Sequence, residues 1–421
     1  MKNFRAFIYN LYHWSKAVLA IARYGYPAGG LTVVGVTGTD GKTTTSHVLY
    51  AILLAAGIKA SLISTTGAII YGRESEDLDL HVTTPSPFKL QKILRDARRA
   101  GSTHIILEST SHGLAQHRVL GCNYRIGVLT NITEEHLDYH GSYDRYLQDK
   151  ARLFRNVETS ILNREDRSYG AMTGLAAGRQ VTYALAGRAD FTAVDIHADL
   201  SGTTFTIPQL DRTIRSSFLA EYNIYNMLAA CAAAHALGID PSAIAAGLEK
   251  ARPPKGRLER VDMGQPFTVF VDFAHTSNGL DQMLQKLRPL VAQQLIVVFG
   301  CAGLRDPNKR DPMGASAGKY ADKTVLTAED PRTEDLDKII DQIAAGAERS
   351  GAVLNESYFR VKARAEAIDF AIRKLARPGD VVVCTGKAHE KSMNYGNGEE
   401  PWDEFAAVRA ALSRITEKTG G

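Results

Sequence analysis

Short apolar runs alternate with segments of helical periodicity along most of the chain. The β-branched run at residues 31–36 leads into a glycine-punctuated turn, and residues 46–56 continue in a helical pattern. Comparable runs, each short enough to be a buried strand, recur at residues 105–107, 126–129, 267–271, 295–299, 324–326 and 381–384. Strands that alternate with helices predict an α/β fold with parallel sheets. Such sheets bind ligands at the carboxyl ends of their strands, so the polar residues that follow these runs are candidates for chemistry.

Two stretches depart from this alternation. Residues 187–214 contain short alternating runs and predict an antiparallel flap. The sequence Arg-Pro-Pro-Lys-Gly at 252–256 predicts a hinge, because paired prolines end the preceding helix. We therefore expect a helical segment at 1–30, a central domain with a parallel sheet at 31–252 and a C-terminal domain at 253–421.

Residues 3–26 form an apolar and aromatic segment that Arg5, Lys16 and Arg23 interrupt. Its charge-free run is too short to span a bilayer, and no small-residue cleavage site follows it. The segment predicts an amphipathic helix. Two positions for this helix remain open, since its apolar face could dock on the protein's own core or rest on a membrane surface.

Composition narrows the class of protein. The chain has 421 residues, 44% of them apolar and 23% charged, which is typical of an ordinary globular protein of about two or three domains. A net charge of +4 weighs against a dedicated nucleic-acid binder. The four cysteines, at positions 122, 231, 301 and 384, have no metal-binding spacing and are typical of reduced thiols in a cytoplasmic protein.

Residues 36–43 nearly match the phosphate-binding pattern G-x-x-x-x-G-K-[ST], with Val36 in place of the first glycine. In such a loop, backbone N–H groups and a helix N-terminus surround the phosphates. Lys42 is expected to reach the β- and γ-phosphates, and the Thr43 hydroxyl is expected to bind Mg²⁺. The loop therefore predicts ATP or GTP binding by Gly38, Thr39, Asp40, Gly41, Lys42, Thr43 and Thr44.

Polar groups also follow other predicted strands. Glu108 ends a buried apolar run, where an acid can hold Mg²⁺ above the phosphates. Residues 130–140 bring hydroxyls, acids and two histidines into one loop, and Asp272 and His275 follow a strand of the C-terminal domain. A lone histidine or glutamate at such a place is more often structural, so it is the clustering that indicates a site.

Ten separated motifs together carry a family resemblance. From about residue 31 to its end the chain resembles the Mur ligases, the ATP-dependent amino-acid ligases of peptidoglycan synthesis. Within them it is most similar to the MurE branch, which adds the third residue of the stem peptide. Each motif is weak alone, and their order and spacing carry the resemblance. They lie at residues 38–44, 83–85, 108–114, 130–140, 150–154, 222–226, 256–260, 272–276, 299–303 and 386–390.

The resemblance implies a second, Rossmann-like α/β ligase domain and a two-step reaction. ATP phosphorylates a substrate carboxylate, and an amine then attacks the acyl phosphate to give an amide, ADP and phosphate. It implies catalytic roles for Lys42, His136, Lys150 and Lys309. Thr43, Glu108, His136 and Lys150 would bind Mg²⁺, with Lys150 carrying a CO₂-derived carbamate. Asn226, Arg257 and Asp272 would contact the nucleotide.

The resemblance also implies two substrate subsites. The muramyl-peptide acceptor would contact Thr83, Thr84, Thr110, Gln116 and Arg118. The amino acid would contact Arg305, Asp330, Arg332, Gly386 and Glu390. The chain departs from the family pattern at Leu304, Asp330 and Ala388, where aspartate, asparagine and glycine are usual. We expect meso-diaminopimelate, for which Arg332 is suited, with L-lysine as the alternative because an acid at 330 would favour an ammonium group.

The resemblance is incomplete at the N-terminus, where MurE enzymes have a UDP-binding domain and this chain has residues 1–30. Three explanations are open: weaker binding of a UDP-linked substrate, a lipid-linked or free muramyl peptide, or a partner that supplies the missing surface. Two other functions also remain open. One is a ligase for another peptide polymer. The other is a non-catalytic nucleotide-binding partner, which the presence of Lys42, Glu108 and Lys150 disfavours.

Overall fold

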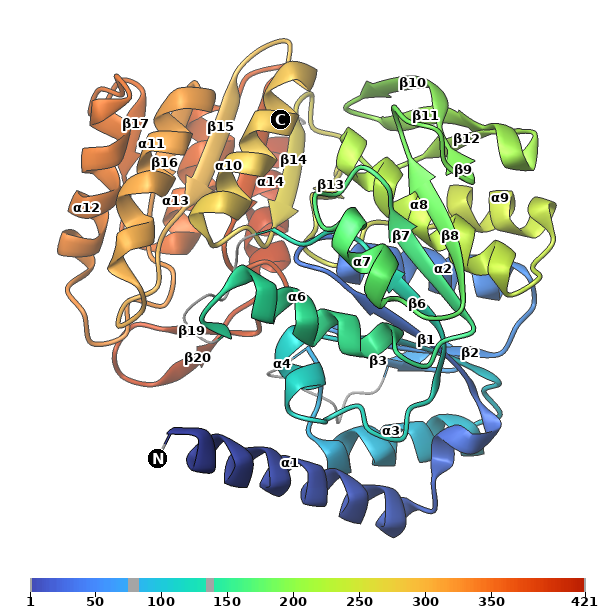
Figure 1. Ribbon diagram of the computed structural model, residues 1–421. Helices are drawn as coiled ribbons and strands as arrows, with labels where there is room; N and C mark the ends of the chain where they lie inside the picture. Colours follow the sequence, from blue (N-terminus) through green and yellow to red (C-terminus); the bar gives the residue numbers. More distant parts are fainter. Residues whose placement is uncertain (1, 75–82, 134–139, 420–421) are drawn as a thin grey trace. The chain divides into compact units, whose positions relative to one another are not determined.

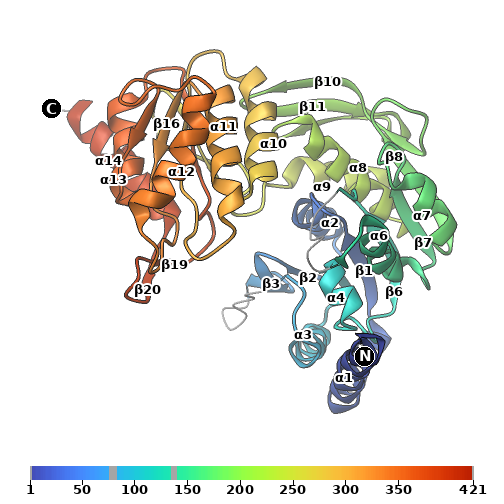
Figure 2. The ribbon, with the colours of Figure 1, turned by 60° about the vertical axis from the view of Figure 1, so that its left-hand side comes forward.

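The computed structural model describes residues 2–74, 83–133 and 140–419. The chain divides into two compact units, residues 1–252 apart from Asp199–Ser201, and residues 253–421 together with those three residues. Each unit is built around its own sheet, with helices packed on it (Figures 1 and 2). The α/β class with parallel sheets predicted from the sequence is confirmed.

A nine-stranded sheet, counted over the described residues, forms the centre of the first unit, with the order β4-β3-β2-β5-β1-β6-β7-β8-β9. Its middle strands β5 (His104–Glu108), β1 (Thr32–Thr37) and β6 (Tyr124–Leu129) are parallel. Val36 pairs with Glu108, and Thr37 pairs with Leu129. The residues that follow these three strands therefore share one edge of the sheet. The other strands are β2 (Ala60–Ser64), β3 (Gly67–Ile70), β4 (Arg73–Glu74), β7 (Thr159–Asn163), β8 (Arg179–Ala184) and β9 (Phe191–Thr192).

The predicted flap is partly correct. Strands β11 (Gly202–Ile207) and β12 (Arg212–Ser216) pair antiparallel, and with β10 (Val194–Asp199) they form a small separate sheet. The prediction fails at β9, which pairs parallel with β8 and so extends the main sheet. The physical reason is Phe191, whose ring is buried in the core of the first unit.

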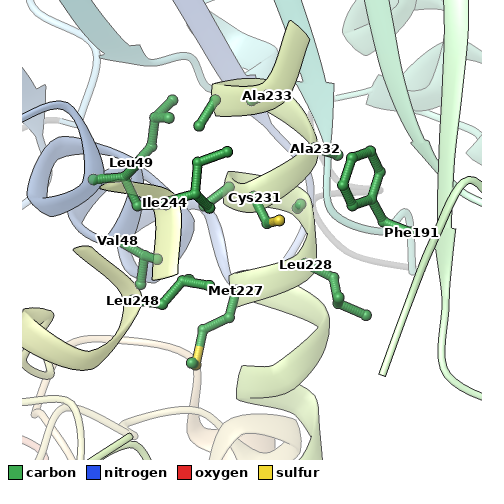
Figure 3. Close-up of a cluster of buried hydrophobic side chains, with 14 of the residues drawn as sticks. Val48, Leu49, Phe191, Met227, Leu228, Cys231, Ala232, Ala233, Ile244 and Leu248 are labelled. Carbon is green, nitrogen blue, oxygen red and sulfur yellow. The ribbon is translucent and has the colours of Figure 1, made fainter. Parts of the chain in front are cut away.

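That core packs around α8 (Glu221–Ala236), which is buried along most of its length. Figure 3 shows Val48 and Leu49 of α2 (Lys42–Ala55) and Ile244 and Leu248 of α9 (Pro241–Lys250) pointing toward this helix. Small residues dominate its sequence, which lets neighbouring helices approach it closely, and a helix that is apolar on all sides is expected to be buried. Further helices in the described part of this unit are α3 (Pro87–Arg99), α4 (Ser111–Ala115), α6 (Tyr143–Ala151) and α7 (Tyr169–Leu175).

The N-terminal helix α1 (Lys2–Tyr24) packs against α3 at the edge of the first unit (Figure 1). The face of α1 that packs on the unit includes Ala17 and Ala20, which are buried. The helix expected at residues 3–26 is thus present and docked. Within the described residues, no helix combines the length and the apolar content needed to cross a bilayer.

The described part of the second unit contains a six-stranded sheet with the order β13-β14-β18-β15-β16-β17. Neighbouring strands in this sheet are parallel, except that β13 runs antiparallel to β14. Its strands are β13 (Glu259–Val261), β14 (Thr268–Asp272), β15 (Leu295–Phe299), β16 (Lys323–Leu326), β17 (Tyr358–Arg360) and β18 (Val381–Thr385). A hairpin is formed by β19 (Ser392–Asn394) and β20 (Glu399–Pro401). The helices are α10 (Ser277–Leu287), α11 (Arg310–Tyr320), α12 (Leu336–Arg349), α13 (Arg364–Phe370) and α14 (Glu404–Thr419).

Candidate active site

The loop between β1 and α2 has the conformation of a phosphate cradle and requires glycine at two positions. Gly38 and Gly41 have φ values of +153° and +79°. A Cβ on Gly38 would lie 1.8 Å from Thr130 Oγ1, and one on Gly41 would lie 2.1 Å from Asn226 Oδ1. The backbone therefore approaches two polar side chains more closely than any other residue type permits.

Polar groups from the loop after β6 and from α6 hold the cradle in place. Asp40 N–H donates to Asn131 Oδ1 at 2.9 Å, and Thr130 Oγ1 donates to the Asp40 carbonyl at 2.6 Å. Thr39 Oγ1 lies 3.1 Å from the Tyr146 hydroxyl. Sequence reasoning did not assign roles to these three supporting residues, although Thr130 and Asn131 stand at a predicted strand end.

Lys42 and Thr43 open α2 directly after the cradle. Lys42 Nζ donates to the Thr39 carbonyl at 2.7 Å, so its ammonium group lies against the loop. Thr43 is buried, and its hydroxyl lies 3.1 and 3.0 Å from the two carboxylate oxygens of Glu108. Thr44 is buried in the same helical turn. No acidic residue lies in the first turn of α2, so the helix terminus retains the positive potential that favours an anion.

Glu108 lies buried at the end of β5 and faces both the cradle and the loop after β2. Besides Thr43, it accepts hydrogen bonds from Thr65 N–H at 2.9 Å and from Thr65 Oγ1 at 3.1 Å. Thr65 was missed in the sequence, where only its position after a strand could have indicated it. The oxygen donors of Thr43 and Glu108 fit Mg²⁺, which binds proteins through few oxygens and keeps several waters. No group of three or more His, Cys, Asp or Glu side chains surrounds a metal position in the described residues.

Lys150 lies buried in the last turn of α6. Its Nζ donates to the Gly38 carbonyl at 2.6 Å and lies 4.4 Å from the centre of the Tyr146 ring. The structure thus brings Lys150 to the cradle. His136, to which sequence reasoning gave a metal role, lies outside the described residues.

The five residues expected at the acceptor subsite lie in one hydrogen-bonded region. Thr83 Oγ1 is 2.9 Å from Thr65 Oγ1, and Thr84 Oγ1 accepts a bond from Thr110 N–H at 2.9 Å. Arg118 donates to the Thr84 carbonyl at 2.8 Å and to Gln116 Oε1 at 2.6 and 2.9 Å. Because Thr65 also bonds Glu108, the hydrogen bonds continue from this region to the phosphate cradle.

Asn226 reaches the cradle from α8. Its Oδ1 accepts a bond from Thr45 Oγ1 at 3.3 Å, and its Nδ2 donates to Asn223 Oδ1 at 3.1 Å. The side chain is buried, with Oδ1 directed toward Gly41. The structure therefore assigns Asn226 contacts with the phosphate loop.

In the second unit, Asp272 at the end of β14 connects two segments of the chain by hydrogen bonds. Its carboxylate accepts bonds from Leu258 N–H and Ala274 N–H, both at 2.8 Å. Burial raises the pKa of Asp272, and the nearby Arg257 guanidinium opposes that rise. Arg257 lies 5.4 Å from the centre of the Phe273 ring, and Lys309 Nζ donates to the His275 carbonyl at 2.7 Å.

Of the residues expected to bind the amino acid, Asp330 and Glu390 contact a buried lysine that sequence reasoning did not single out. Lys387 Nζ donates to both carboxylate oxygens of Asp330 at 3.0 Å and to Glu390 Oε2 at 2.5 Å. The sequence predicts that the Asp330 charge favours an ammonium group on the substrate, but this ion pair compensates that charge. Arg332 donates to the Gly303 carbonyl at 3.0 Å, whereas Arg305 lies exposed in the loop before α11.

Glu329, next to this cluster, is a buried carboxyl group in an unusual environment. Its Oε2 has no hydrogen-bond partner among the described residues, and a Cβ on Gly386 would lie 2.9 Å from it. Burial raises the Glu329 pKa to about 7, although the charges of Lys309, Arg364 and Lys387 lower it. In the sequence, Glu329 is marked only by its position next to Asp330.

Two family models match the chain. The Mur ligase middle domain matches residues 36–234, and the Mur ligase glutamate ligase domain matches residues 256–388.

Similar proteins agree with these matches. A UDP-N-acetylmuramyl-tripeptide synthetase of Roseiflexus sp. (strain RS-1) is 39% identical, over 95% of this chain and 82% of its own. A UDP-N-acetylmuramoyl-L-alanyl-D-glutamate–2,6-diaminopimelate ligase of Geobacter metallireducens is 37% identical, over 96% of this chain and 82% of its own. A solved structure of a ligase with that same name superimposes with a TM-score of 0.69 at 32% identity, over 92% of this chain and 79% of its own.

Proposed function

This chain belongs to the Mur ligase family, and we propose that it joins a diamino acid to the D-glutamate carboxylate of a muramyl-L-alanyl-D-glutamate precursor. It is an ATP-dependent ligase of peptidoglycan synthesis, as the family is, and Mur ligases use Mg²⁺. The proposal concerns the two substrates, which the names of its relatives suggest. Those names include both tripeptide synthetases and diaminopimelate ligases.

One observation carries the proposal. Hydrogen bonds run from Thr43 in the phosphate cradle through Glu108 and Thr65 to Thr83, within a single unit. A nucleotide in the cradle and an acceptor at the threonines would therefore lie at the two ends of one rigid network. Such fixed positions supply much of the rate of phosphoryl transfer, in which the protein mainly orients reactants and neutralises charge.

The reaction proceeds in two balanced steps. An oxygen of the acceptor carboxylate attacks the γ-phosphorus, the bond to the β-phosphate oxygen breaks, and ADP leaves. The amine then attacks the acyl carbon, an amide forms, and inorganic phosphate leaves with its electron pair while the ammonium nitrogen loses its proton to solvent. Lys42 and the cradle N–H groups would stabilise the charge that develops on the phosphates. Thr43 and Glu108 would hold Mg²⁺, which supplies further neutralisation of that charge.

We assign Lys150 a carbamate. The ammonium group first loses a proton to solvent, and the neutral amine then adds to CO₂, so that a nitrogen–carbon bond forms and a second proton is released. A cation thereby becomes an anionic oxygen ligand. Its burial beside Gly38 and Tyr146 supports this role, because an anion there could serve a metal close to the phosphates. His136 would be a second ligand by the resemblance alone.

In the second unit the resemblance assigns nucleotide contacts to Arg257 and Asp272 and a contact with the transferred phosphate to Lys309. Arg332 would bind the distal carboxylate of meso-diaminopimelate through its planar guanidinium group. Compensation of Asp330 by Lys387 supports diaminopimelate over L-lysine, since the acid is then not free to repel that carboxylate. Glu390 and the backbone at Gly386 would contact the amino group.

The group that carries the acceptor peptide, either UDP or a lipid, is a separate part of the proposal. We take the UDP-linked peptide as the first candidate because the relatives' names specify it. A lipid-linked peptide is the second candidate, favoured by the exposed apolar side chains of α1.

The test is phosphate release with product masses read from the same reactions. Purified protein, ATP and Mg²⁺ are combined with a UDP-linked or a lipid-linked muramyl dipeptide, and with meso-diaminopimelate, L-lysine or no amino acid. We expect a tripeptide product with diaminopimelate, its loss in Lys42→Ala, and no loss in Lys59→Ala, which removes an exposed lysine. Absence of product from every combination would overturn the proposal.

A further inference from the structure

The outward face of α1 carries an unusual amount of exposed apolar surface. Ile8 lies three and four residues before Leu11 and Tyr12, and Val18 and Leu19 each lie seven residues after one of these two, so the five residues share one helix face. Between 37% and 62% of each side chain is exposed to solvent. We call these five residues the outer stripe. Scattered single apolar side chains need no explanation, whereas a contiguous stripe along a helix does.

The opposite face fixes the helix to its unit. Ala17 and Ala20 are buried, and Asn10 Oδ1 lies 2.7 Å from His117 Nε2. A Cβ on Gly121 would lie 2.7 Å from Ile21 Cδ1, which shows how closely the helix approaches this loop. In both views α3 lies beside α1 (Figures 1 and 2). The outer stripe is therefore not the surface by which α1 packs on its own unit.

The charges of α1 indicate what would cover the stripe. The helix sequence contains no aspartate or glutamate, while Lys16 and Arg23 lie beside the stripe. Tyr12 and Trp14 are exposed aromatic residues, which prefer the boundary between apolar and aqueous phases. Two copies pairing through α1 would bring like charges together, whereas a surface with anionic headgroups and an apolar interior complements both features.

We propose that α1 binds the surface of an anionic lipid bilayer through the outer stripe. The helix lies in the plane of the membrane, with Leu11 and Leu19 among the acyl chains and the two basic side chains at the headgroups. It does not cross the membrane. A second step of this inference rests on the proposed function. Gln116, which is proposed to contact the muramyl-peptide acceptor, donates a hydrogen bond to the Tyr9 hydroxyl of α1 at 3.3 Å. Membrane binding would therefore hold the acceptor subsite close to a lipid-linked peptide.

The experiment is flotation of the full chain with vesicles, without any substrate. Vesicles of phosphatidylglycerol and phosphatidylethanolamine are compared with vesicles of phosphatidylcholine alone. We expect the wild-type protein to float with the anionic vesicles and to be released by salt. Leu11→Glu/Leu19→Glu should bind at least about tenfold more weakly, since each leucine contributes several buried carbon atoms. Leu54→Glu, at an exposed leucine of α2, is the matched control and should bind as the wild type does.

Two further readouts separate the outcomes. Brominated acyl chains should quench Trp14 fluorescence on binding, and the double variant should keep its melting temperature and its turnover on a soluble acceptor. Wild-type protein that stays unbound, or a double variant that floats equally well, would overturn the proposal. So would a wild-type dimer that the double variant converts to a monomer, because a second copy would then cover the stripe. Loss of ligase activity on every acceptor would instead refute the proposed function and leave the flotation result intact.

Discussion

Lys387 donates to both carboxylate oxygens of Asp330 at 3.0 Å, and its buried ammonium group also contacts Glu390. A buried cation between two carboxylates compensates the departure from the family pattern that kept L-lysine as the alternative substrate in the sequence. Asp330 also accepts a bond from Asn394 N–H at 2.9 Å, so its carboxylate is already bonded on more than one side. These bonds fix the Asp330 side chain in place.

Asp330→Asn should therefore leave amino-acid selection almost unchanged. The isosteric amide keeps an acceptor for Lys387 and for Asn394 N–H, and the charge that it removes was already compensated. We expect the ratio of kcat/KM for meso-diaminopimelate to that for L-lysine to change by less than about threefold. Steady-state kinetics with each amino acid measures this ratio. A change of tenfold or more would mean that the Asp330 charge reaches the substrate.

Glu108→Gln should weaken Mg²⁺-dependent nucleotide use. Glutamine keeps the size of the side chain but removes the negative charge that faces Thr43, and its NH₂ group would oppose the donors of Thr65. We expect kcat/KM for Mg·ATP to fall about 10- to 100-fold, with a higher Mg²⁺ requirement. Titration of Mg²⁺ at saturating ATP measures the effect. Glu158→Gln, at an exposed glutamate, is the control, and equal behaviour of the two variants would exclude a metal role for Glu108.

Strand ends could be predicted from the sequence because the signal is local. An apolar run marks a strand, and the next polar residue, as at Glu108 or Asp272, is positioned by that strand alone. Thr65 and Tyr146 could not be found in this way, because their partners Glu108 and Thr39 lie 43 and 107 residues away along the chain.

The same limit explains Asp330. Its compensating lysine is 57 residues distant, and only folding brings the two side chains together. The residue types expected to bind the amino acid could therefore be predicted, but their charge balance could not. The parallel direction of neighbouring strands could be predicted, because parallel strands need a crossover connection, which is usually a helix. The place of β9 could not, since it depends on the burial of one phenylalanine.

Glu329→Gln should change the pH dependence of stability. The Glu329 pKa is about 7 in the folded protein against 4.5 without the fold, so folding favours the protonated form. Lys309, Arg364 and Lys387 oppose this rise, and Glu390 adds to it. The contribution of Glu329 to the free energy of unfolding is fully present below pH 4.5 and is lost as the pH rises through 7. Glutamine stays neutral, so the variant should gain about 3 kcal/mol over the wild type between about pH 5 and pH 8.

Denaturant unfolding at several pH values measures that difference. Glu334→Gln is the matched control, because its bonds with Arg310 lower the Glu334 pKa to about 2. Glu334 is then ionised throughout this pH interval in both states, and its stability difference from the wild type should stay constant above about pH 6. A constant difference for Glu329→Gln as well would show that Glu329 is ionised in the folded protein at neutral pH.

Lys150→Arg should prevent formation of the carbamate proposed at this position. A guanidinium group does not add CO₂ under these conditions, and arginine keeps a positive charge beside Gly38. In ¹³C-bicarbonate the wild-type protein should show an acid-labile carbamate carbon signal, which the variant lacks, and the variant should lose activity. An identical signal in both proteins would place the modification elsewhere or exclude it.

Gly41→Ala should strongly weaken ATP binding, and the same substitution at Gly57 separates the effect of the new Cβ contact from that of backbone strain. Both Gly41 and Gly57 have left-handed backbones, with φ of +79° and +71°, so alanine adds a similar strain of about 1–2 kcal/mol at either position. The two positions differ in their surroundings. At Gly41 the new Cβ would lie 2.1 Å from Asn226 Oδ1, whereas at Gly57 nothing lies within 4 Å. Gly41→Ala must therefore displace Asn226 or the cradle, and ATP affinity measured by calorimetry should fall steeply. Gly57→Ala should lower the melting temperature but bind ATP normally. Equal ATP affinity in the two variants would show that the contact between Gly41 and Asn226 does not shape the cradle.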